Sequence, residues 1–109
     1  MTGNEYQLAA MRTAGNIERE NLLTNGALGL AGESGEVADM VKKHLFQGHH
    51  LDTEKIAREL GDVAWYLAEA ATGLGVDLSD VLQRNLDKLH ARYPQGFDTK
   101  RSQRREQEQ

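Results

Sequence analysis

Two pairs of carboxylates, each with a spacing of three residues, flank a predicted turn near the middle of the chain. The first pair is Glu33 and Glu36, and the second is Glu59 and Asp62. Residues three apart lie on the same side of an α-helix, so each pair projects from one helix face. If the two helices form an antiparallel hairpin centred between residues 47 and 48, Glu33 faces Asp62. Glu36 faces Glu59 for the same reason, and the sequence therefore predicts four acids at one level of the hairpin.

Four carboxylates at one level repel one another unless a cation lies between them, because like charges in a partly desolvated site cost several kcal/mol. All four are hard oxygen ligands, the chain has no cysteine, and neither pair is the Glu-x-x-His motif of di-iron bundles. This ligand set favours Mg²⁺, with Mn²⁺ as a substitute. The histidines at 44, 49 and 50 are better explained as exposed turn residues than as a zinc site, because no cysteine accompanies them.

Size and composition limit the classes of protein to which the chain can belong. Its 109 residues are enough for one domain with a modest core, so association with a further copy is expected. The net charge of −4 argues against nucleic acid as the main partner. We find no signal peptide and no apolar run of membrane-spanning length, and the absence of cysteine fits a reducing compartment. The expected location is cytoplasmic, with no membrane partner.

Apolar residues recur at helical spacing through most of the chain and predict an all-α fold. Helices are expected over residues 4–13, 22–45, 53–74 and 78–93. The expected architecture is a helical hairpin of the four-helix-bundle type, completed by oligomerisation. A turn at residues 92–97 should close the domain and dock Phe97. Residues 98–109 are charged and contain no apolar side chain, which predicts a frayed, disordered tail without a function.

Glycine occupies positions 26, 29, 32 and 35 of the first long helix. Each glycine costs about 1 kcal/mol of helix stability relative to alanine, so four within ten residues need an explanation. One hypothesis is that the bare backbone lets a ligand or a neighbouring helix approach closely. The other is that the helix begins late or kinks in this segment. The sequence does not decide between them.

Several other side chains are candidates for contact with a substrate. Asn85, Lys88 and Arg92 recur at spacings of three and four and form one polar stripe, which could hold phosphate oxygens or be a solvated face. Lys43 is a weaker candidate. Trp65 and Tyr66 could stack on a nucleobase, although packing is the commoner role of aromatic residues on a helix.

The acidic segments also carry a resemblance to a known family. The runs GLAGESGEVAD at 29–39, ELGDVAWYL at 59–67, NLDKL at 85–89 and RYPQGF at 92–97 resemble the MazG-like nucleotide pyrophosphohydrolases. The resemblance covers about residues 5–97, within an expected domain of residues 1–97. It implies an all-α fold, a homodimer or homotetramer of helical hairpins, and hydrolysis of a nucleoside triphosphate to the monophosphate and pyrophosphate. The all-α dUTPases and phosphoribosyl-ATP pyrophosphohydrolases share this superfamily, so the base and the sugar stay open.

The resemblance implies Mg²⁺ at Glu33, Glu36, Glu59 and Asp62. One of these acids, Glu36 or Glu33, could instead orient or deprotonate the attacking water. The alternative to an enzyme is a non-catalytic helical module whose acids are a surface cluster and whose apolar stripes mediate assembly. The matched positions of the two acid pairs argue against that alternative.

Overall fold

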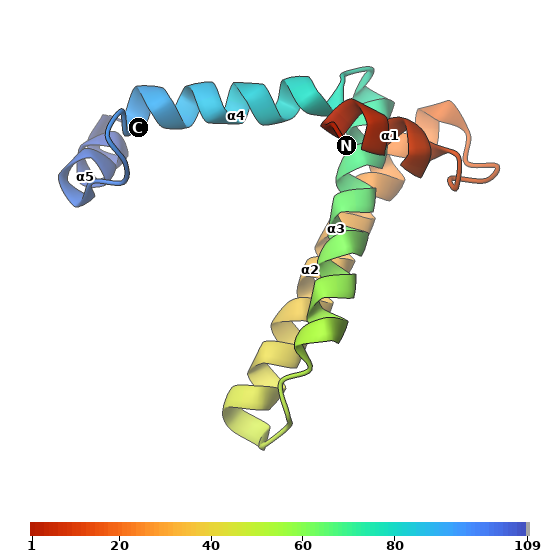
Figure 1. Cartoon of the computed structure of the whole chain (residues 1–109), viewed down its shortest axis with the longest axis horizontal. Helices are drawn as coiled ribbons and strands as arrows, with labels where there is room; N and C mark the ends of the chain where they lie inside the picture. Colours follow the sequence, from red (N-terminus) through yellow and green to blue (C-terminus); the bar gives the residue numbers. More distant parts are fainter. Residues whose placement is uncertain (109) are drawn as a thin grey trace.

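The structure, a computed structural model, describes residues 1–108 and has no β-strand in that part of the chain (Figure 1), which confirms the all-α fold class. In chain order the elements are α1 (Gly3–Met11), the 3-10 helix η1 (Arg19–Asn21), α2 (Leu22–Gln47), α3 (Thr53–Leu74), α4 (Leu78–Arg92) and α5 (Thr99–Glu108). The two longest helices, α2 and α3, lie side by side as an antiparallel hairpin (Figure 1). This hairpin carries both acid pairs.

The turn of the hairpin forms where the sequence predicts it. Gly48 ends α2 with φ of 71°, a left-handed conformation that glycine adopts without steric cost. Asp52 caps α3, because its Oδ1 accepts a hydrogen bond of 3.0 Å from the backbone N–H of Lys55. Local residue chemistry thus determines where both helices end at the turn.

The glycines of α2 let α3 approach closely, and α2 is continuous from Leu22. A Cβ on Gly26 would lie 2.8 Å from the backbone nitrogen of Ala70, and a Cβ on Gly29 would collide with the ring of Tyr66. A Cβ on Gly32 or on Gly35 would meet nothing within 4 Å. The hypothesis of close approach is therefore right for the first two glycines, with a neighbouring helix as the partner. The hypothesis of a late start is wrong, because α2 begins at Leu22, before the first of these glycines.

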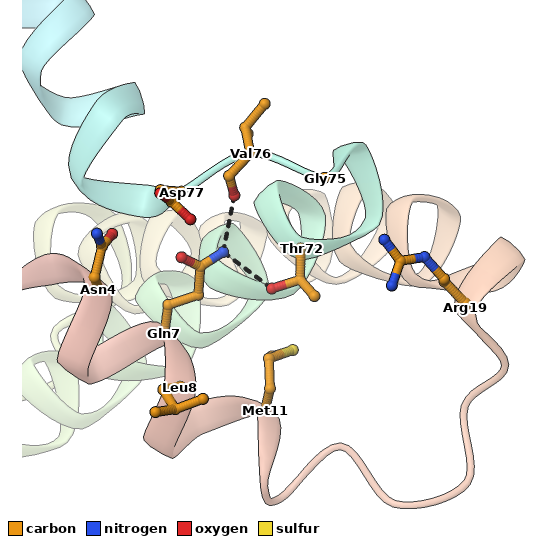
Figure 2. Close-up of a pocket in the computed structure, with 9 residues that line it drawn as sticks. All are labelled: Asn4, Gln7, Leu8, Met11, Arg19, Thr72, Gly75, Val76 and Asp77. Carbon is orange, nitrogen blue, oxygen red and sulfur yellow. Dashed lines mark hydrogen bonds between the residues drawn. The ribbon is translucent and has the colours of Figure 1, made fainter.

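Helix α1 lies across the end of the hairpin opposite the turn and contacts both α3 and α4. The side-chain amide of Gln7 donates hydrogen bonds of 3.0 Å to Thr72 Oγ1 and to the backbone oxygen of Val76 (Figure 2). Its Oε1 accepts a bond of 2.8 Å from the N–H of Leu78, the first residue of α4. One glutamine thus satisfies the N–H that the start of α4 leaves unpaired and a carbonyl of the connection between α3 and α4. Beside it, Ala10, Ala68 and Leu78 form a small buried core cluster.

Helix α4 leaves this junction and runs away from the hairpin (Figure 1). The leucines of α4 beyond Leu78 are consequently uncovered: Leu82 is 47% exposed, Leu86 48% and Leu89 40%. A single chain therefore does not form the expected four-helix bundle. The apolar stripe that the sequence places on α4 has no covering partner among residues 1–108.

Two expectations about the C-terminal segment are wrong. Phe97 does not dock, since it is 74% exposed and contacts the ring of Tyr93 at a centroid distance of 5.3 Å. The reason is that α4 carries this segment away from the core. Where a frayed tail was expected, α5 forms, and Asp98 Oδ1 accepts a bond of 2.8 Å from the N–H of Lys100 near its start. Gln109, the last residue of the predicted tail, lies outside the described residues.

Among residues 1–108, no helix combines the length and the apolar composition that crossing a bilayer requires.

Candidate metal and substrate site

Three of the four predicted acids meet between the helices of the hairpin. Carboxylate oxygens of Glu33, from α2, and of Glu59 and Asp62, from α3, all lie within 4.8 Å of one another. We call these three residues the acid triad. Glu33 and Glu59 are partly buried, and Asp62 is exposed. The triad thus lies at the border between the helix contact and solvent, where a cation could enter.

The electrostatics of the triad favour an added positive charge. The pKa of Glu33 rises from its ordinary value of 4.5 to about 7, chiefly because its carboxyl shares a hydrogen bond with Glu59. Burial and the charges of Glu36, Glu59 and Asp62 raise it further. Within the described chain, Oε2 of Glu33 is buried and has no hydrogen-bond partner. A proton on Glu33 and a bound cation are two ways of relieving the same repulsion.

This pKa predicts how the stability of the metal-free protein depends on pH. Folded Glu33 holds its proton up to about pH 7, whereas the unfolded residue releases it near 4.5. The folded state therefore binds more protons between these values, and the stability from this group is lost as pH rises through that window. We expect the melting temperature in EDTA to fall from pH 5 to pH 7.5. Excess Mg²⁺ should reduce that fall, because metal replaces the proton.

Differential scanning fluorimetry at matched ionic strength tests this expectation. Glu33→Gln is the matched variant, since its uncharged side chain cannot titrate and should flatten the metal-free profile. A metal-free profile that rises over the same window in the native chain and is unaltered by Glu33→Gln would contradict it.

Glu36, the fourth predicted acid, is exposed and is not a member of the acid triad. Its charge still acts on Glu33 and contributes to the raised pKa. The reason for its position is rotational: a residue three further along α2 lies about 60° around the axis from Glu33 and points more toward solvent. Glu33 and Asp62 lie together as predicted, and Glu59 joins them to complete the group of three.

A cavity of about 360 Å³ adjoins the triad and is lined by Thr13, Glu33, Asp62, Trp65 and Tyr66. The rings of Trp65 and Tyr66 meet nearly at right angles, with an interplanar angle of 86° and centroids 5.1 Å apart. Trp65 also packs on the buried core cluster, which confirms the packing role, while its stacking on a nucleobase stays a prediction. Acids and aromatic rings thus line the same hollow.

Thr13, in the loop after α1, lines this cavity and was not a candidate from the sequence. The sequence gives no signal for Thr13, because a threonine in a polar loop belongs to no motif and to no periodic pattern. A second residue without a sequence signal is Glu69, which is fully buried and accepts bonds of 2.8 and 3.0 Å from the side chain of Asn25. This pair ties α2 to α3 on the side of the triad away from the turn.

Lys43 lies far from the triad along α2. It follows Glu33 by ten residues, which is about 15 Å of helix. Its Nζ forms an ion pair of 2.8 Å with Asp39, and the residue lines a separate cavity at the turn with His49 and His50. The structure therefore does not bring Lys43 to the acids within one chain.

Asn85, Lys88 and Arg92 are carried by α4, which points away from the hairpin (Figure 1). The structure does not bring them to the acid triad of their own chain. A further cavity of about 420 Å³ is lined by residues of α1, of the end of α3 and of the α3–α4 connection, including Gln7, Thr72 and Val76 (Figure 2). Thr72 follows Asp62 by ten residues of α3, so this hollow is also about 15 Å from the triad along the helix.

Comparison with known proteins gives two matches. The profile of the MazG nucleotide pyrophosphohydrolase domain matches residues 23–97, a segment that contains the acid triad, Glu36 and α4. The chain is also 42% identical over 100 residues to the Gene 37 protein of Mycobacterium phage L5, an alignment that covers 84% of this chain and 88% of that protein. No solved structure matches the chain.

Proposed function

The chain belongs to the MazG nucleotide pyrophosphohydrolase family, and from this premise we propose that it hydrolyses a nucleoside triphosphate to the monophosphate and pyrophosphate. The observation that carries the proposal is the acid triad, whose oxygens lie within 4.8 Å of one another beside a cavity with aromatic walls. Carboxylates suit a metal that neutralises phosphates, and aromatic rings suit a base. A cluster of acids that is only a solvated surface would not need an aromatic cavity beside it.

The residues of the triad fit Mg²⁺, with Mn²⁺ as a substitute. All three offer hard oxygen ligands, and the unpartnered buried Oε2 of Glu33 is an atom that a cation would satisfy. We propose that Glu33, Glu59 and Asp62 hold the metal. When bound, Mg²⁺ would neutralise phosphate charge and favour attack on the phosphoanhydride.

We assign Glu36 a different task from the triad. It is exposed, it lies one helical turn from Glu33, and its carboxylate does not join the three that meet. A carboxylate in that position can accept a hydrogen bond from a water and take its proton. Glu36 is therefore our choice for the residue that orients the attacking water.

The phosphate contacts require a second copy of the chain. Lys88 and Arg92 are the candidates for these contacts, with Asn85 beside them, and α4 holds all three away from their own triad (Figure 1). The exposed leucines of α4 are the surface that a second copy would cover. We propose a homodimer or homotetramer in which α4 of one copy brings these side chains to the triad of another. Arginine suits this role because its guanidinium binds phosphate oxygens in pairs.

The test is an assay of products from a panel of canonical and modified (d)NTPs with Mg²⁺, with EDTA as a control. We expect metal-dependent release of pyrophosphate and a monophosphate from at least one nucleotide. Orthophosphate and a diphosphate would mean attack at another phosphorus and would refute the proposed reaction. No turnover with any nucleotide, in a chain that is helical and binds Mg²⁺, would favour a non-catalytic helical oligomerisation module.

A further inference from the structure

A hydrogen-bond network fixes Thr13 at the wall of the cavity beside the triad. Its hydroxyl donates a bond of 2.7 Å to the backbone oxygen of Ala10. The same hydroxyl oxygen accepts a bond of 2.8 Å from the indole N–H of Trp65, which also reaches the Ala10 oxygen at 3.2 Å. Both partners hold the hydroxyl in one orientation, although Thr13 itself is in an exposed loop.

This network determines which kind of hydrogen bond Thr13 can still make. A hydroxyl has one proton and two lone pairs. Its proton is committed to Ala10, and one lone pair is committed to Trp65. What remains is one lone pair, so in this arrangement Thr13 can accept a hydrogen bond but cannot donate one.

The adjoining side chains indicate what a ligand would place there. Trp65 and Tyr66 form a corner of two perpendicular rings on the same cavity, and Glu33 and Asp62 line it as well. A nucleotide with its phosphates toward the acids would direct its base toward the rings. The edge of that base would then meet the lone pair of Thr13.

We propose that Thr13 determines base specificity, with its hydroxyl oxygen accepting a hydrogen bond from the exocyclic amino group of a cytosine or adenine base. The proposal rests on the proposed function, because it places a nucleotide in the cavity beside the triad. An amino group at this edge of the base is a donor, whereas the oxo group of uracil or hypoxanthine is an acceptor. An oxo group would face a lone pair unless the hydroxyl turned and broke its bond to Ala10. The chain should therefore prefer an amino-bearing base to its deaminated counterpart.

The experiment compares kcat/KM within two pairs of substrates, dCTP with dUTP and dATP with dITP. We expect the native chain to favour the amino-bearing member of at least one pair about tenfold, the effect of one hydrogen bond. Thr13→Val removes the hydroxyl while Trp65 keeps its bond to Ala10, so the ratio should fall to about one. Thr13→Ser keeps the hydroxyl and should keep the ratio. Thr24→Val, at an exposed threonine in the first turn of α2, is the matched control and should leave it unchanged.

The outcomes separate this inference from the proposed function. Equal kcat/KM within both pairs in the native chain, or a preference that Thr13→Val does not alter, overturns the role of Thr13 and leaves the hydrolysis intact. If no nucleotide is hydrolysed, isothermal titration calorimetry measures the binding of the four nucleotides to the native chain and to Thr13→Val, with Ca²⁺ in place of Mg²⁺. A preference for amino-bearing bases that Thr13→Val abolishes then supports the inference without the reaction. The absence of binding overturns both.

Discussion

Glu33→Gln is expected to lower kcat/KM for pyrophosphate release by more than about 100-fold. Loss of a residue that merely supports a metal ligand costs about 10- to 100-fold, and loss of a charged ligand should cost more. The same change should raise the melting temperature in EDTA at pH 7.5, because it removes one charge from three carboxylates that lie within 4.8 Å of one another. Activity and metal-free stability should therefore change in opposite directions. That combination is typical of a site that is strained without its ligand.

Rates of pyrophosphate release and melting curves with and without Mg²⁺ measure both effects. Glu54→Gln is the matched control, because Glu54 is an exposed acid in the first turn of α3 and is not part of the triad. It should leave both quantities nearly unchanged. A Glu33→Gln enzyme with native kcat/KM would refute the assignment of this residue to the metal.

Glu36→Gln separates the two tasks that we assign to the acids. If Glu36 orients water, its loss should lower kcat while the stabilisation by Mg²⁺ stays close to that of the native chain. If Glu36 is a fourth metal ligand, the stabilisation by Mg²⁺ should fall together with kcat. Melting temperatures measured at increasing Mg²⁺ concentrations distinguish these results, because the stabilisation depends on the affinity for the metal.

Gly26→Ala is expected to destabilise the protein by about 3 kcal/mol, at the upper end of the usual cost of overpacking. The added methyl group would lie 2.8 Å from the backbone nitrogen of Ala70 and 2.9 Å from its Cα and Cβ. Backbone cannot move aside as a flexible side chain can, so α2 and α3 would have to separate. A domain of this size loses about 4–8 °C of melting temperature per kcal/mol. Because the triad spans these two helices, activity should fall as well.

Gly35→Ala is the matched control, on the same helix and with the same added methyl group. A Cβ at Gly35 meets nothing within 4 Å, so only helix propensity changes. We expect it to raise stability by up to about 1 kcal/mol. Chemical denaturation of the two variants measures both values. Equal changes in the free energy of unfolding for the two variants would mean that α2 and α3 lie further apart at Gly26 than in the structure.

The sequence by itself determined the helices α1 to α4, the turn of the hairpin and the approximate level of the acids. Helix α3 begins and ends at the predicted residues, because Asp52 caps its first turn and Gly75 ends it with φ of 75°. The pairing of Glu33 with Asp62 also follows from counting residues on each side of the bond between residues 47 and 48. These features depend on helical periodicity and on the conformational preferences of single residues. Both are local properties of a segment and do not require the rest of the fold. The family match, over residues 23–97, includes the same acidic segments.

Tertiary packing decided which of these residues act together. Only Gly26 and Gly29 of the four glycines face α3 at close range, and only three of the four acids converge. Both outcomes depend on how each helix is rotated about its axis, which is a property of the two packed surfaces. Thr13 reaches the cavity because α1 packs on α3 and its loop meets Trp65, 52 residues further along the chain. The direction of α4 likewise depends on the junction at Gln7. Contacts between residues far apart in sequence have no local signal, because their free energy exists only once both elements are in place.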